Sequence, residues 1–100
     1  MKTIWKFPLE IANHQIIESP SKAQFLSIEA QKGVPVVYCL VDTQNPREDI
    51  HIYLFGTGEP IDHVKSPLDY LGTVTLENGS VWHIFQSDIK NKKELFKTWG

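Results

Sequence analysis

The sequence predicts a mainly β protein (α+β): an antiparallel β sandwich or partly open barrel of about seven strands, with a short C-terminal helix. Three observations predict this class. Alternating or β-branched apolar runs recur at hairpin spacing between residues 3 and 86, separated by turn-forming residues. The intervals between them are too short for the helical crossovers of a parallel sheet. Only after Ser87 do apolar residues take helical spacing.

Length and composition indicate a single domain spanning residues 1–100, since no repeat or change in composition marks a boundary. The net charge of −2 provides no basic field for a nucleic-acid polymer. The longest apolar run, residues 34–41, is too short to cross a membrane. Its Cys39 is the only cysteine, which fits a reducing compartment and a buried core thiol. We therefore expect a cytoplasmic protein without membrane or polymeric nucleic-acid partners.

The first half of the chain predicts two hairpins. Residues 3–9 alternate, and Pro8 marks them as an edge strand or a strand end because proline cannot donate to a ladder. Residues 15–18 resemble a short return strand for that first run. Residues 23–30 and 34–41 form the second hairpin, in which the β-branched run 34–41 is expected to be central and buried on both faces.

The second half predicts one more strand, a further hairpin and the helix. Residues 50–55 alternate and lead into a glycine-rich turn, and residues 70–76 and 81–85 are joined by Asn78-Gly79, the strongest short hairpin signal. The alternation of 70–76 is expected to place four residues on one face: Tyr70, Gly72, Val74 and Leu76.

The expected helix begins at Ser87, a suitable N-cap. Its apolar stripe would consist of Ile89, Leu95, Phe96 and Trp99. The sequence leaves open whether this stripe packs on its own sheet or on another subunit.

Enzyme motifs are missing, so no catalytic residue, metal or cofactor is expected. The glycine turn completes neither a phosphate-binding loop nor a dinucleotide fingerprint, and no nucleophile elbow occurs. Glu59, Asp62 and His63 form the only local acid–base cluster, which a small hydrolase could use but a solvated loop also explains. His51 and His83 could be metal ligands or half-buried strand histidines.

The turn at residues 55–61 is the strongest candidate for binding. Gly56, Thr57 and Gly58 could present backbone N–H groups and a hydroxyl to a small anion, or could simply form a turn with positive φ. Further cations and stacking surfaces are available elsewhere, although most aromatic side chains of a small β protein fill its core. These candidates are Lys6, Arg47, Lys65, Trp5, Tyr38, Tyr53 and Trp82.

Several of these segments also carry a family resemblance. Five segments occur in a familiar order: the opening Ile4-Trp5-Lys6-Phe7-Pro8-Leu9, then Val34-Pro35, Leu40-Val41-Asp42, Phe55-Gly56-Thr57-Gly58-Glu59-Pro60-Ile61 and Tyr70-Leu71-Gly72-Thr73. The chain resembles a family of short phage and prophage proteins without an assigned function. That family has an Ile-Trp-Lys start and a Gly-Thr-Gly-x-Pro-Ile turn. The chain departs from it at Glu59, where histidine is expected to be common, and in the tail from Ser87 to Gly100.

The resemblance implies a function through a second, more distant similarity, to the phage sponges that counter CBASS immunity. Such proteins sequester cyclic dinucleotide signals without cleaving them, which suits a chain that lacks catalytic motifs. A homo-oligomer with sites shared between subunits is implied, because a chain of 100 residues has little room for a deep pocket. The ligand-binding residues would be Trp5, Lys6, Gly56, Thr57, Gly58 and Glu59. The alternative is a module that inhibits or redirects a host protein through a sheet edge or the helix stripe.

Overall fold

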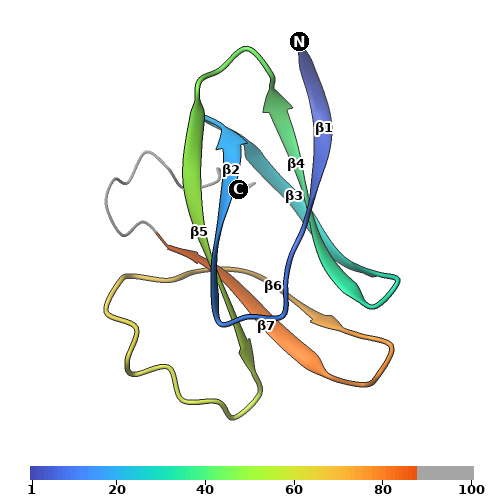
Figure 1. Ribbon diagram of the computed structural model, residues 1–100, viewed down its shortest axis with the longest axis vertical. Coiled ribbons are helices and arrows are strands. Elements are labelled where there is room, and N and C mark those ends of the chain that lie inside the picture. Colours follow the sequence, from blue (N-terminus) through green and yellow to red (C-terminus); the bar gives the residue numbers. More distant parts are fainter. Residues whose placement is uncertain (88–100) are drawn as a thin grey trace.

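The computed structural model describes residues 1–87, which form an antiparallel β sandwich (Figure 1). The seven strands are β1 (Lys2–Pro8), β2 (His14–Pro20), β3 (Gln24–Gln31), β4 (Val34–Asp42), β5 (Arg47–Gly56), β6 (Asp69–Thr75) and β7 (Val81–Ser87). They confirm the predicted fold class and the expected number of strands.

The strands form one sheet of three, in the order β1-β4-β3, and one of four, in the order β2-β5-β7-β6. The hairpins β3–β4 and β6–β7 are confirmed, and β4 is central in its sheet as expected. The predicted first hairpin is wrong, because β1 pairs with β4 and β2 with β5. The segment between β1 and β2 crosses from one sheet to the other. Leu9 N–H donates to Pro35 at its start, and Leu54 N–H donates to Asn13 at its end.

The core lies between the two sheets. Five of its side chains are completely buried, namely Val37 and Cys39 of β4, Ile52 and Leu54 of β5, and Ile84 of β7. Cys39 is thus the buried thiol that the sequence predicts. Because alternate residues of a strand face opposite sides, the burial of Ile52 and Leu54 directs Tyr53 away from the core. This alternation determines the composition of the outer face of the four-stranded sheet.

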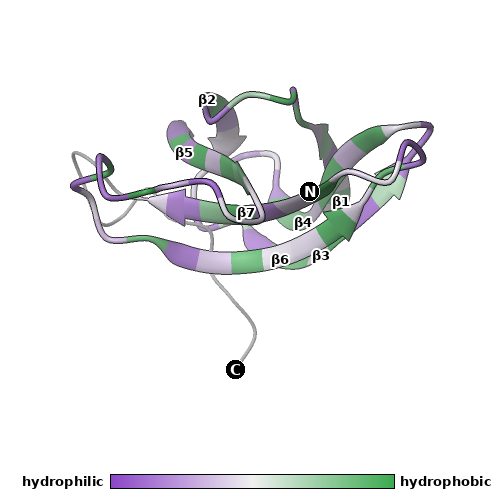
Figure 2. Cartoon of the chain, turned by 90° about the horizontal axis from the view of Figure 1, so that it is seen from below, coloured by the Kyte–Doolittle hydropathy of each residue, from purple (hydrophilic) through white to green (hydrophobic). Residues whose placement is uncertain are grey.

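The sandwich closes along β3 and β6, which lie side by side (Figure 2). An added Cβ at Gly72 of β6 would lie 3.4 Å from Ile28 Cδ1, so glycine permits this close approach. The register of β6 against β7 shifts between Tyr70 and Gly72. This bulge overturns the expected alternation: Leu71 faces inward and is 8% exposed, whereas Tyr70 faces outward and is 58% exposed.

The expected C-terminal helix falls on residues 88–100, outside the part of the chain that the structure describes. Ser87, its expected N-cap, is the last residue of β7. Within residues 1–87 no helix is long and apolar enough to cross a membrane.

Candidate functional site on the outer face of the four-stranded sheet

The glycine turn directly after β5 is held by two hydrogen bonds between its first and last residues, Gly56 and Glu59. The Glu59 backbone N–H donates to the Gly56 carbonyl oxygen at 3.1 Å, and the Gly56 N–H donates to Glu59 Oε1 at 2.9 Å. Gly58 has a φ of 86°, a left-handed conformation that glycine adopts without strain. The turn therefore already holds an anion of its own, the Glu59 carboxylate. A phosphate could not take the Gly56 N–H without displacing it.

The Thr57 hydroxyl begins a row of polar side chains that runs from this turn across β7 to β6. Thr57 Oγ1 lies 2.7 Å from His83 Nε2, and His83 Nδ1 lies 3.0 Å from Thr73 Oγ1. Thr73 Oγ1 lies in turn 2.5 Å from the Tyr70 hydroxyl. Both nitrogens of the His83 ring are thus held by hydroxyls, which can each donate or accept as the tautomer requires. We call Thr57, His83, Thr73 and Tyr70 the polar row.

Aromatic and imidazole rings lie beside the polar row on the same face of the sheet. Tyr53 and Phe55 stack with centroids 6.0 Å apart, and Phe85 lies 6.2 Å from Phe55 and 5.4 Å from Tyr70. The ring of His14 stacks on Tyr53 at 4.7 Å. We call the whole set the aromatic face: His14, His51, Tyr53, Phe55, His63, Tyr70 and Phe85.

Strand register gathers these rings. Tyr53 of β5 lies opposite His14 of β2 on one side and Phe85 of β7 on the other, and Phe85 lies opposite Tyr70 of β6. The four rings therefore form one line across the sheet. Phe55 is 3% exposed and lies at the floor, while Tyr70 at the rim is mostly exposed. The result is a surface of graded depth that could stack a flat ring and hydrogen-bond its edge.

Two histidines at the end of this line are coupled. His14 Nε2 lies 2.9 Å from His51 Nδ1, so one ring must be the donor and the other the acceptor. The pKa of His14 is lowered from its usual value, first by burial and then by the charge of His51. Burial and the neighbouring His51 ring therefore disfavour the charged form of His14. No group of three or more potential metal ligands occurs within the described residues.

The structure brings together four of the six predicted binding residues and separates the other two from them. Gly56, Thr57, Gly58 and Glu59 share the turn beside the aromatic face. Trp5 and Lys6 are on β1, in the other sheet.

Trp5 packs against the core and lies edge-on to Phe7, with ring centroids 6.3 Å apart. The Arg47 guanidinium carbon lies 4.9 Å from the centre of the Trp5 ring. The exposed Lys6 donates to Gln31 Oε1 at 3.0 Å. Neither residue is placed to join the turn within one chain.

Thr73, Tyr70 and Phe85 are among the residues of this site that were absent from the predicted binding residues. Their positions depend on the pairing of β6 with β7 and on the bulge in β6. Two patterns in the sequence pointed toward the surface. His51, Tyr53 and Phe55 alternate with aliphatic residues, and a glycine inside the strand 70–76 is typical of a bulge.

The fold and this face define the chain as a small β sandwich with a ring-covered outer surface. Residues 1–94 match a protein family described as a domain of unknown function (DUF7352), and the chain belongs to this family. The match extends beyond Ser87. No curated protein and no solved structure matches the chain.

Proposed function

We propose that this chain is a phage-encoded immune-evasion protein, acting in the host cytoplasm, that sequesters cyclic dinucleotides without cleaving them. The observation that carries the proposal is the polar row beside the aromatic face, in which His83 is held between Thr57 and Thr73. A flat ring of a ligand could stack on the aromatic face while its edge forms hydrogen bonds with the polar row. These are the two contacts by which proteins hold unpaired nucleobases.

The rings would contribute most of the affinity. Stacking of a base on an aromatic side chain is worth about 1–3 kcal/mol, whatever the base. Tyr70 and Phe85 are the accessible rings next to the polar row, and Tyr53 continues the surface between them and His14. The hydroxyls of Thr57 and Thr73 would then read the base edge or the ribose.

The phosphates need a different partner from the one that the sequence predicts. The Gly56 N–H is already used by Glu59, and Lys6 lies on the other sheet. We therefore propose a homo-oligomer in which a second copy brings cationic groups, Lys6 among them, to the ligand. A ligand enclosed by two copies would also compensate for the open shape of the aromatic face.

The direct test is calorimetric titration of the purified protein with a panel of cyclic dinucleotides. We expect saturable binding by the wild type, recovery of intact nucleotide after heating, and loss of binding in Tyr70→Ala and His83→Ala. The matched control is Thr75→Ala, on an exposed residue of β6 outside the polar row, which should bind normally. Absence of binding across the panel, or conversion of the nucleotide, would refute the proposal.

Native mass spectrometry before and after mixing tests the shared site. It reports the number of subunits and the bound mass together. A nucleotide bound to a single free chain, with a bound mass unaffected by Lys6→Gln, would contradict the shared site but not nucleotide binding itself.

The alternative function is an interaction module for a host protein, and the exposed edge strands favour it. Ile4 of β1 and Ile16 of β2 are 59% and 54% exposed, each on a strand at the end of its sheet. Edge strands offer unpaired backbone groups to a partner strand. If Ile16→Glu abolishes capture of a host protein and leaves nucleotide binding unchanged, the exposed edge of β2 is the surface that binds the host protein. Unchanged capture would exclude β2 as the docking edge.

A further inference from the structure

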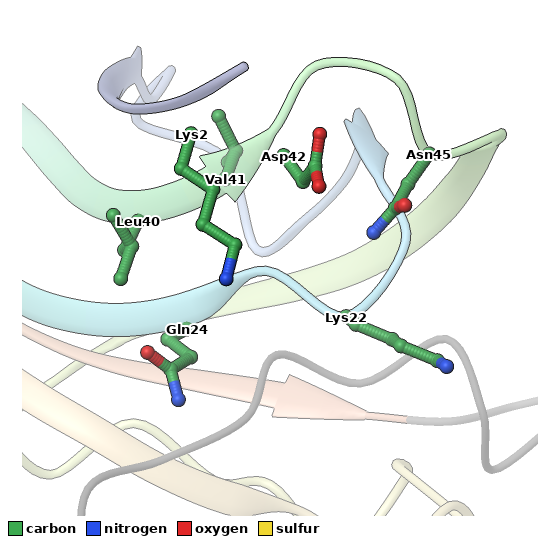
Figure 3. A pocket seen from close by; sticks show the side chains of 7 residues that line it. All are labelled: Lys2, Lys22, Gln24, Leu40, Val41, Asp42 and Asn45. Atoms are coloured by element: carbon green, nitrogen blue, oxygen red, sulfur yellow. The ribbon is translucent and has the colours of Figure 1, made fainter.

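A cavity of about 340 Å³ lies on the three-stranded sheet, away from the aromatic face. Its size is at the lower end of the range for small-molecule sites. It is bounded by the end of β4 and by the turns that follow β2 and β4 (Figure 3). The lining residues are Lys2, Lys22, Gln24, Leu40, Val41, Asp42 and Asn45.

Two ammonium groups at this cavity have no hydrogen-bond or ion-pair partner within residues 1–87. They belong to Lys2, on β1, and to Lys22, in the turn between β2 and β3. Gln24 likewise makes no side-chain hydrogen bond in that part of the chain. Figure 3 shows the Lys2 side chain extending toward β3, the Gln24 amide pointing away from the Lys2 ammonium on the same side of the cavity, and Lys22 extending from its turn on the other side.

The carboxylate at this cavity is already engaged. Asp42 Oδ1 accepts a hydrogen bond from the Gln44 N–H at 3.1 Å and lies 3.4 Å from the amino group of Met1. The Gln44 hydrogen bond is the main cause that lowers the pKa of Asp42, and the Met1 amino group and Lys2 act in the same direction. Because the Met1 amino group opposes the charge of Asp42, the two lysines leave the cavity positively charged.

The turn that carries Lys22 is fixed in place. The Ser21 N–H donates to the Pro46 carbonyl at 2.8 Å, and Asn45 Nδ2 donates to the Ser21 carbonyl at 2.9 Å. Lys22 itself has a φ of 63°, in the left-handed region that costs a residue with a side chain some strain. The turn after β2 is hydrogen-bonded to the turn after β4, so the backbone of Lys22 is restricted. The charge of Lys22 is therefore held beside the cavity.

A second cavity, of about 320 Å³, also contains two lysines and provides a comparison. Lys32 has a positive φ of 52° there, and Lys22 in the first cavity likewise has a positive φ. The other lysine, Lys6, already donates to Gln31. The first cavity therefore differs from the second in having both of its ammonium groups available.

We propose that the first cavity binds a small dianion, a phosphate monoester or a dicarboxylate. Lys2 and Lys22 neutralise its charge, the Gln24 amide donates a hydrogen bond, and the Leu40 side chain packs against its carbon atoms. Lysine acts as a point charge toward such anions and imposes no planar geometry on them. This site is independent of the proposed nucleotide site, because the two lie on different sheets.

The test is a titration of the isotope-labelled full chain with inorganic phosphate, glycerol 3-phosphate and succinate, followed by amide chemical shifts. We expect saturable shifts at residues 22–24 and 40–45. Lys2→Gln and Lys22→Gln should each weaken binding about tenfold, whereas arginine at either position should retain it. Binding should weaken with added salt, since the lysines are accessible to solvent. Preference for glycerol 3-phosphate or for succinate identifies the source of the anionic group.

Lys65→Gln is the matched control, since it removes the same charge from the loop between β5 and β6. It should change the affinity less than twofold. Equal weakening by Lys65→Gln, or shifts that do not saturate, would overturn the proposal by showing a general charge effect. His83→Ala should leave phosphate binding unchanged, so failure of the nucleotide proposal and failure of this one are distinguishable.

Discussion

The Glu59 carboxylate and the Gly56 backbone N–H are hydrogen-bonded to each other at 2.9 Å, across the turn that follows β5. The same two residues are joined a second time, through the Glu59 N–H and the Gly56 carbonyl. The Glu59 carboxylate thus occupies the place that a bound anion would take beside the backbone N–H groups of this turn. The Glu59 side chain therefore stabilises the turn and occupies the Gly56 N–H that a bound phosphate would need.

Replacing Glu59 by alanine should therefore destabilise the turn. We expect the free energy of unfolding to fall by about 1 kcal/mol, the usual net value of a partly exposed hydrogen bond. Glu59→Gln, whose amide oxygen can still accept, should lose less. Glu77→Ala is the control, because Glu77 is exposed and its loss changes the net charge equally. Chemical denaturation measures all three, and an equal loss in Glu77→Ala would contradict the role of the hydrogen bond.

The left-handed conformation of Gly58 gives a second prediction. Nothing lies within 4 Å of an added Cβ at this position, so Gly58→Ala should act through the backbone alone. The expected loss is about 1 kcal/mol in the free energy of unfolding, and Gly58→Asn should lose less because asparagine tolerates this region.

Gly56→Ala tests the cause of that loss. An added Cβ at Gly56 would make only an ordinary contact, 3.8 Å from Glu59 Oε1, and Gly56 does not have a positive φ. We expect it to cost less than Gly58→Ala. The reverse order, measured by thermal unfolding, would show that crowding rather than backbone strain governs the turn.

Local patterns in the sequence predicted the strands and two of the three expected hairpins. The Asn78-Gly79 pair and the Gln31–Gly33 turn join strands that are adjacent in space. The prediction of the first hairpin failed because residues 9–13 connect two sheets, and nothing in so short a segment distinguishes a hairpin turn from a crossing between sheets. Which sheet a strand joins depends on contacts between distant residues, such as Trp5 with Cys39.

The candidate site was predicted only in part for the same reason. The turn at residues 56–59 is local, so the sequence located it. The partners of Thr57 are His83 and, through it, Thr73, which come from strands after the turn. Tyr70 joins them because the bulge reverses its direction, and a strictly alternating pattern predicts the opposite.

The Cys39 thiol should be unreactive in the folded protein. Burial raises its pKa to about 12, so the nucleophilic thiolate is scarce at neutral pH. A disulfide reagent should label the folded chain at pH 8 far more slowly than it labels the denatured chain. Cys39→Ala serves as the blank. Rapid labelling of the folded protein would mean that the sandwich opens around β4 on the timescale of the reaction.

The His14–His51 pair should make stability depend on pH. The pKa of His14 is lowered in the folded chain from its usual value of 6.5. Below pH 6.5 the unfolded chain therefore binds a proton that the folded chain resists, so acidification favours unfolding. The folded state is destabilised by this effect only below pH 6.5. Stability is therefore greatest above that pH and is lost as the pH falls through the lowered pKa of His14 in the folded chain.

We expect the melting temperature of the wild type to fall between pH 7 and pH 5, and His14→Gln to show a shallower decline. His63→Gln is the control, since it removes an imidazole that contacts Phe55 instead of His51. Melting curves recorded between pH 7 and pH 5 for the wild type and both variants measure these slopes. If His14→Gln keeps the full slope of the wild type, protonation at His14 is not what weakens the fold in acid, and the hydrogen bond between the two rings carries no pH dependence of its own.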